Sequence, residues 1–183
     1  MPRVIPVTLI GVLAGRLWAS ALHDHVWWPY LFTAEPGSLK SKVTAIQRSE
    51  AMNFYHSWAT QPPKFLYATL IIVALVALSL LAALLQKPTQ KPQNLASLLS
   101  FLAFIGIQAL KVVPQIPKFQ YHTRPTPDKE AAMLFDLAFW NALSLAAIVG
   151  TILFQIVAED EEGEVRVKKR KKVRAEVVEV KKD

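Results

Sequence analysis

The sequence predicts an all-α membrane protein: a bundle of four transmembrane helices followed by a charged C-terminal tail that is disordered or only transiently helical. Two observations support this prediction. Hydrophobic residues make up 52% of the 183 residues and are gathered into four long runs, whereas charged residues are concentrated between the runs and after the last one. A helix needs roughly 20 apolar residues to cross a hydrocarbon core of about 30 Å, and each run is near this length.

The four runs predict transmembrane helices at about 4–22, 65–85, 95–113 and 133–158. With their connections they form one transmembrane domain over residues 1–158. The turn after the second run contains Pro88 and Pro92, which lack a backbone donor and stop the helix. Because this turn is short, we expect the second and third helices to be antiparallel neighbours.

The first run contains one charged residue, Arg16, and two glycines, Gly11 and Gly15, whose spacing permits close approach of another helix. Residues 19–21, Ala-Ser-Ala, resemble a signal-peptide cleavage site. A signal peptide, however, has a purer apolar core and is followed by polar mature sequence. We therefore favour a retained helix over a cleaved signal peptide.

The longest connection, residues 23–64, is rich in aromatic residues near both of its ends. Tryptophan and tyrosine favour the headgroup level of a bilayer, where the ring is half apolar and its polar atom stays hydrated. We therefore expect these aromatic side chains, which include Trp27, Tyr55 and Trp58, to form an interfacial belt. Between them, residues 42–58 could form a short helix that lies on the membrane surface.

The tail, residues 159–183, begins with acidic residues and then becomes strongly basic. Its nine basic and eight acidic residues give a net charge of +1, which argues against nucleic-acid binding. A segment this charged cannot bury enough apolar area to offset its ordering entropy, so disorder is expected. The basic run is a lipid-headgroup patch, a trafficking signal or the stop-transfer charge that sets topology. Its members, which are our candidates for interactions of the tail, are Arg166, Lys168, Lys169, Arg170, Lys171, Lys172 and Arg174.

The distribution of positive charge predicts the orientation. Four helices put both termini on one side, which carries twelve lysine and arginine residues against eight in the opposite loops. The positive-inside rule therefore predicts cytosolic termini. The margin comes from the tail, because the count without it is three against eight and the predicted orientation reverses.

The sequence predicts no catalytic, cofactor-binding or metal site. Cysteine is absent, which excludes disulfides, thiolate metal ligands and thiol catalysis. There is no phosphate-binding glycine loop and no nucleophile elbow. The histidines His23, His25, His56 and His122 all fall in the two loops opposite the tail. His23 and His25 flank Asp24 and could contribute to a metal site, but polar residues collect in loops whenever the rest of a chain is apolar.

Polar residues within the apolar runs are our candidates for contact with helices of another protein. A charge such as Arg16 is costly at membrane depth, and Asp136, in the first turns of the fourth helix, is a candidate partner. The alternative is that Arg16 snorkels toward the nearby interface. Asn141, Gln155 and Gln108 could hydrogen-bond across helices, either within the bundle or to client helices.

Two segments carry a resemblance to a known family. The first is 50–58, Glu-Ala-Met-Asn-Phe-Tyr-His-Ser-Trp, followed by two prolines at 62–63 and the second apolar run through 84–87. The second is 128–133, Asp-Lys-Glu-Ala-Ala-Met, followed by Asn141 and by 149–155, Val-Gly-Thr-Ile-Leu-Phe-Gln. Together with the four runs and the charged tail, they resemble the fungal endoplasmic-reticulum membrane chaperones that package amino-acid permeases. The similarity extends over most of residues 1–158.

The resemblance implies a non-enzymatic protein of the endoplasmic-reticulum membrane. Members of this family shield the helices of newly made permeases from aggregation and help to load them into coated vesicles. It implies amino-acid permeases as clients and vesicle-coat components as partners of the tail, with neither a cofactor nor nucleic acid. A bundle with few buried charges suits reversible holding, because an interhelical hydrogen bond in a membrane is worth only about 0.6 kcal/mol.

Two other functions stay open. A non-catalytic scaffold subunit of a membrane lipid- or sterol-processing complex would co-purify with enzymes instead of permeases. A small enzyme or transporter would use the histidine-containing loops and the Arg16–Asp136 pair, and would lose activity when His23 and His25 are changed.

Overall fold

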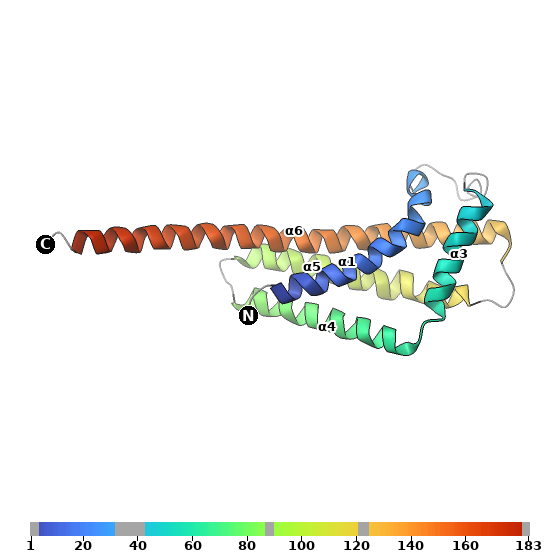
Figure 1. Cartoon of the computed structure of the whole chain (residues 1–183), viewed down its shortest axis with the longest axis horizontal. Coiled ribbons are helices and arrows are strands. Elements are labelled where there is room, and N and C mark those ends of the chain that lie inside the picture. Colours follow the sequence, from blue (N-terminus) through green and yellow to red (C-terminus); the bar gives the residue numbers. More distant parts are fainter. Residues whose placement is uncertain (1–3, 32–42, 87–89, 121–124, 181–183) are drawn as a thin grey trace.

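The computed structural model describes residues 4–31, 43–86, 90–120 and 125–180, and it describes side chains in these segments except at 4–7 and 159–180. Every regular element in the described segments is helical, which confirms the predicted all-α class (Figure 1). Three helical segments are long and apolar enough to cross a membrane: Pro63–Gln86, Lys91–Phe119 and Pro127–Ala158.

Four long helices run alternately in opposite directions (Figure 1). They are α1 (Val4–Asp24), α4 (Pro63–Gln86), α5 (Lys91–Ile107) and α6 (Pro127–Val180). The most extensive contact is between α5 and α6, and α1 packs against both α6 and α4. The short turn makes α4 and α5 antiparallel neighbours, as its length predicts.

A second layer lies across the end of the bundle that is remote from the N-terminus (Figure 1). It consists of the short helix η1 (His25–Tyr30) and of α3 (Ala45–Ala59), so the predicted helix in this connection is confirmed. The start of α3 is set by a capping box. The Thr44 hydroxyl accepts from the Gln47 amide nitrogen at 3.3 Å, and Gln47 Oε1 accepts from the Thr44 amide nitrogen at 3.1 Å.

The third apolar run was predicted to form one helix that ends at Val113, but the helix changes its geometry before that residue and continues beyond it. After Ile107 the α-helix widens into a π-helical turn, η4 (Gln108–Val112), and then tightens into a 3₁₀ segment, η5 (Val113–Phe119). Pro114 cannot donate a backbone hydrogen bond to the preceding turn, and a π-turn next to a proline accommodates that missing bond. The irregular segment carries the chain across the end of the bundle toward α3, with which η5 is in contact.

The tail differs from the expectation of disorder. Helix α6 continues without a break from Pro127 to Val180 and extends far beyond the bundle (Figure 1). Glutamate, lysine, arginine and alanine are good helix formers, and Glu162 precedes Arg166 by four residues, a spacing that stabilises helices. The prediction of disorder depended on the small apolar area of the tail. The tail is helical instead, because its residues favour helix and because it continues a helix that has already formed.

The apolar core has two parts. One lies between α1, α4, α5 and α6 and contains Ile10, Leu80, Phe101 and Ile148. The other lies beneath η1 and α3 and contains Trp27 and Tyr55, both fully buried. The predicted interfacial belt is therefore wrong for these two rings, because the second layer folds back and encloses them.

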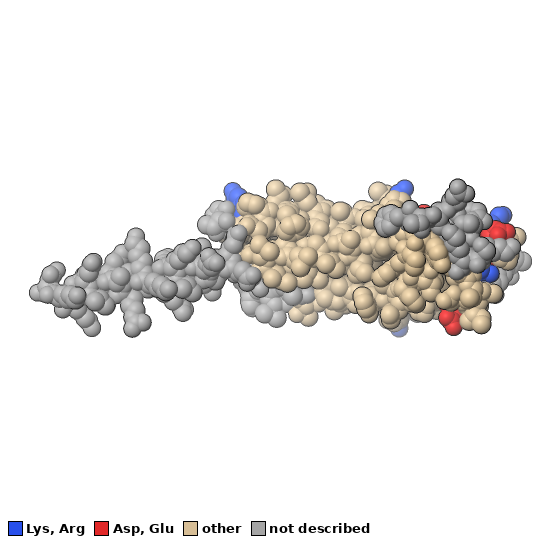
Figure 2. All heavy atoms as spheres, turned by 90° about the horizontal axis from the view of Figure 1, so that it is seen from above, with Lys and Arg blue, Asp and Glu red and all other residues tan. Residues whose placement is uncertain are grey.

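Charge is distributed unevenly along the molecule. Figure 2 shows charged side chains toward the two ends of the bundle and a broad band of uncharged residues between them on this face. That pattern is the one expected of a protein embedded in a bilayer, because a charge within the hydrocarbon core is costly.

Candidate functional site

A buried polar cluster joins three helices where α1 meets the second layer. The Tyr55 hydroxyl lies 2.7 Å from each carboxylate oxygen of Asp24, to which it donates. Asn141 Nδ2 lies 2.9 Å from Asp24 Oδ2 and 2.9 Å from the Tyr55 hydroxyl oxygen. The cluster therefore connects the end of α1 to α3 and to the first third of α6.

Burial dominates the electrostatics of this cluster, which lies just beyond the apolar run 4–22. Asp24 and Tyr55 are fully buried and Asn141 is nearly so. Burial raises the pKa of Asp24 to about 6, although the hydrogen bonds from Asn141 and Tyr55 and the nearby His25 act to lower it. Burial and the adjacent Asp24 raise the pKa of Tyr55 well above its usual range. The Tyr55 hydroxyl therefore stays protonated and donates a hydrogen bond to the carboxylate.

A second feature is a cavity of about 410 Å³ between α1, α4 and the α5–η5 segment. It lies within the length of two candidate spans, Pro63–Gln86 and Lys91–Phe119. Its walls are mainly apolar and include Leu17 of α1, Leu70 of α4 and Phe104 of α5. A volume of this size is typical of small-molecule pockets, which combine apolar walls with a few polar groups.

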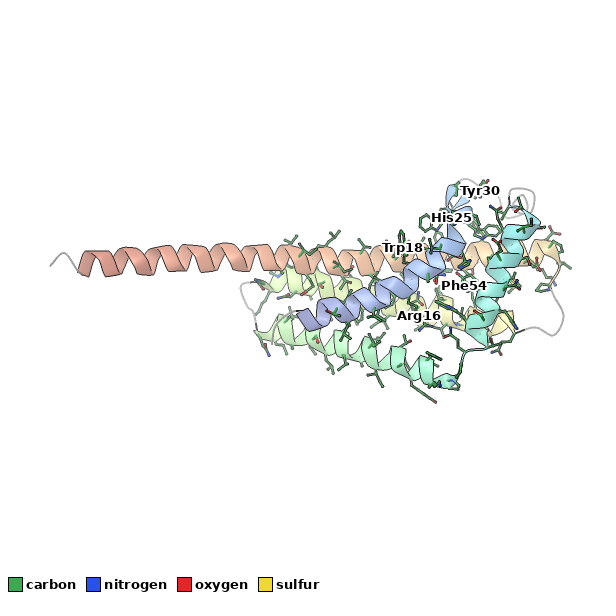
Figure 3. The ribbon with its side chains drawn as sticks, in the orientation of Figure 1. Arg16, Trp18, His25, Tyr30 and Phe54 are labelled. Carbon is green, nitrogen blue, oxygen red and sulfur yellow. The ribbon has the colours of Figure 1, made fainter. Side chains whose placement is uncertain are left out.

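Arg16 is the charged residue on the wall of this cavity. Its guanidinium donates to the Thr69 hydroxyl of α4 and lies 4.6 Å from the centre of the Trp58 ring. Figure 3 shows Arg16 on the side of α1 that faces α4, and Trp18 on the opposite side. The guanidinium thus stands between an apolar cavity and the aromatic residues of the second layer, where cation–π attraction partly compensates its charge.

The predicted Arg16–Asp136 pair is wrong. Asp136 Oδ2 accepts from Gln115 Nε2 at 2.7 Å, and its Oδ1 accepts from Trp140 Nε1 at 3.0 Å. Arg16 contacts Thr69 and Trp58 instead. The two residues lie at different positions along the bundle. Arg16 precedes Asp24 by eight positions on α1, whereas Asp136 precedes Asn141, which contacts Asp24, by five positions on the antiparallel helix α6. They are therefore displaced in opposite directions from the polar cluster, by about 12 Å and about 7.5 Å.

The other three residues predicted to contact client helices have partners within the chain. Gln108 Nε2 lies 2.9 Å from the Ser144 hydroxyl, and Gln155 Nε2 lies 3.4 Å from Asn94 Oδ1. The first contact joins η4 to α6, the second joins α5 to α6, and Asn141 belongs to the polar cluster. These side chains stabilise the bundle itself, which was one of the two roles expected of them. Contact with clients stays a prediction.

The described histidines, which come from α1, η1 and α3, do not converge on a common point. His23 stacks on Phe54 with ring centroids 4.1 Å apart, and His25 Nδ1 lies 2.7 Å from the Leu22 carbonyl oxygen. His56 Nδ1 lies 2.8 Å from the Phe119 carbonyl oxygen. Asp24, between the first two, points into the polar cluster. Within the described residues, no group of three metal-ligating side chains is found.

Some predicted positions lie outside the described residues. His122 is one of them. So are the side chains of the tail candidates Arg166, Lys168, Lys169, Arg170, Lys171, Lys172 and Arg174, of which the structure describes only the helical backbone.

Helix α1 presents an open apolar face. Gly11, Gly15, Trp18 and Leu22 recur at helical spacing and are all exposed, Trp18 and Leu22 to 58% each. A methyl group added at Gly11 or Gly15 would meet nothing within 4 Å. The small residues that the sequence offered for close helix approach therefore contact no other helix among the described residues.

The sequence did not predict the contacts of the polar cluster or of the cavity. Tyr55 was assigned to the membrane interface, and Asp24 was considered only beside its neighbouring histidines. Their contact spans 31 residues and Asn141 is more distant still, so no local spacing could have revealed it. A single acidic residue at the end of an apolar run was the available signal.

Comparison of the chain with protein families, with curated proteins and with solved structures finds no match.

Proposed function

We propose that this chain is a non-enzymatic chaperone of the endoplasmic-reticulum membrane that helps amino-acid permeases to fold and to enter transport vesicles. In this proposal α1 is a fourth transmembrane helix over about 4–22, both termini are cytosolic and the charged tail contacts the vesicle coat. The resemblance of segments 50–58 and 128–133 to the packaging chaperones is the starting point.

The observation that best supports the proposal is the open face of α1. Two glycines four residues apart let another helix approach closely, and such approach is how helices associate in lipid. Trp18 and Leu22 extend the same face with large apolar side chains that are exposed. A chaperone needs an apolar surface that it does not itself fill, whereas the amides of α5 and α6 are already occupied within the bundle.

Deletion of the gene followed by imaging of tagged permeases tests this function. We expect several amino-acid permeases to aggregate in the endoplasmic reticulum while unrelated membrane cargo leaves normally. Restoration with a Gly15→Val variant is expected to fail, because the branched side chain blocks helix approach on the open face. Gly106→Val, at a glycine of α5 that also has nothing within 4 Å, is the matched control. Normal permease export in the deletion strain would refute the proposal.

The second candidate, a scaffold subunit of a lipid- or sterol-processing complex, is favoured by the cavity beside Arg16. Affinity purification separates the two functions. A scaffold would retain membrane enzymes in stoichiometric amount, whereas a chaperone would retain newly made permeases only transiently.

A further inference from the structure

We propose that the cavity between α1, α4 and the α5–η5 segment binds one anionic lipid, with its oxyanion on Arg16 and a hydrocarbon chain along the apolar walls. The proposal does not depend on a chaperone function. Its support comes from the charge of Arg16, from the opening of the cavity and from the position of Arg16 along α1.

The charge of Arg16 is not neutralised by any described residue. A guanidinium has five N–H donors, and that of Arg16 contacts the Thr69 hydroxyl and the face of the Trp58 ring. Thr69 cannot supply a negative charge, and its own hydroxyl donates to the Phe65 carbonyl oxygen at 2.9 Å. A phosphate or carboxylate group would accept two parallel hydrogen bonds from N–H groups of the guanidinium. Its negative charge would neutralise the guanidinium within the membrane.

The cavity is open on the side where lipid would enter. Leu66 and Leu70 of α4 line it and are 50% and 53% exposed, and Val113 on the opposite wall is 49% exposed. These positions belong to two candidate spans, so their surroundings in a membrane are acyl chains. A chain that enters between α4 and η5 meets apolar walls as far as Leu17 and Phe104.

The depth of Arg16 also suits a lipid headgroup. Arg16 precedes Asp24, the last residue of α1, by eight positions, which is about 12 Å along the helix. Trp58, which belongs to the second layer, and Gln120, which follows η5, line the same cavity. The lipid therefore belongs to the leaflet on the α3 side of the molecule, with its headgroup toward α3 and its chain toward the membrane centre.

Photo-crosslinking of the full-length protein in vesicles tests the proposal. The vesicles consist of phosphatidylcholine with a small fraction of phosphatidylserine that carries a diazirine on one acyl chain. Parallel samples carry the diazirine on phosphatidylcholine or on a free fatty acid. We expect phosphatidylserine to label residues of α4 and α5 that line the cavity. Arg16→Gln lowers this labelling about tenfold, the effect expected from losing a charge-assisted hydrogen-bonded pair, and Arg16→Lys retains most of it.

Two further variants make the test decisive even if Arg16→Gln does not fold. Leu70→Trp fills the cavity and is expected to abolish labelling by either anionic lipid. Lys111→Gln is the matched control, because Lys111 lies over the Trp140 ring and does not line the cavity. Labelling by the fatty acid alone, sensitive to Arg16, supports the site and identifies a free carboxylate as its ligand. Equal labelling by phosphatidylcholine and phosphatidylserine, or unchanged labelling of Leu70→Trp, overturns the proposal.

Discussion

The Tyr55 hydroxyl donates to both carboxylate oxygens of Asp24, at 2.7 Å each, and thereby fastens α3 to the end of α1. Both side chains are fully buried, so the carboxylate is separated from water and depends on protein donors. Asn141 supplies the second donor from α6. Three side chains from three helices therefore help to fix the second layer on the bundle, together with the apolar cluster beneath it.

Removing the Tyr55 hydroxyl is expected to destabilise the protein. Tyr55→Phe leaves Asp24 with one donor fewer in a buried site, and a hydrogen bond to a charged group is worth about 1.5–3 kcal/mol. The measurement is the free energy of unfolding of the purified protein in mild detergent. Tyr67→Phe, at an exposed position of α4, is the control and is expected to change stability little. Equal stability of the two variants would contradict the assigned role of the cluster.

The raised pKa of Asp24 predicts a specific pH dependence. The folded protein holds this proton more tightly than the unfolded chain, whose Asp titrates near 3.8, so the contribution of Asp24 to stability falls as pH rises from about 4 to 6. Asp24→Asn removes this dependence and leaves His23 and His25 in place. We expect the wild type to lose stability relative to Asp24→Asn between about pH 4 and pH 7, as measured by unfolding in detergent. A difference that is constant with pH would show that the carboxyl titrates normally.

Gly150 is expected to tolerate no large side chain. A methyl group at this position would lie 2.7 Å from the Ser100 hydroxyl oxygen, which itself donates to the Ala147 carbonyl oxygen at 3.0 Å. Gly150→Leu should force α5 and α6 apart and cost about 1–3 kcal/mol of unfolding free energy.

Two comparisons check the explanation for Gly150. Gly106→Leu, in open space on α5, is expected to be nearly neutral. Gly150→Ala should be better tolerated in a Ser100→Ala background, because the hydroxyl that it meets is gone. If Gly106→Leu costs as much as Gly150→Leu, close approach at Gly150 is not the cause.

Removal of residues 163–183 is expected to leave the bundle intact. Ala158 is the last core position of α6 in the described part of the chain, and its carbonyl oxygen accepts from Gln90 Nε2 at 2.6 Å. Retaining 159–162 keeps this carbonyl within a helical turn. The melting temperature in detergent should match that of the full chain, and the corresponding free energy should change by less than about 0.5 kcal/mol. A large decrease would mean that the tail contributes to the fold. Replacing residues 163–183 by a Gly/Ser segment of equal length, which removes both the charge and the helix, would then be compared with a variant that keeps the helix but lacks the charge.

The class of the fold could be predicted from the sequence, because length and hydropathy of a run decide whether it can be a membrane-spanning helix. Three apolar segments were found on that basis, and their connections were predicted from prolines and from loop length. Composition also predicted the uncharged band of Figure 2. Such properties are local, since each depends on residues that are adjacent in the chain or one turn apart.

The candidate sites were decided by the tertiary structure. Whether Arg16 meets Asp136 or Thr69 depends on how far along the bundle each residue lies and on the rotation of α1 about its axis. The packing of Ile10, Leu13 and Leu17 against the other helices sets both for α1. The burial of Tyr55 against Asp24 depends on the path of a long connection. The sequence by itself therefore determined which segments are helices and where charge is tolerated. Only packing decided which polar groups meet, because that depends on the relative rotation and position of helices distant in the chain.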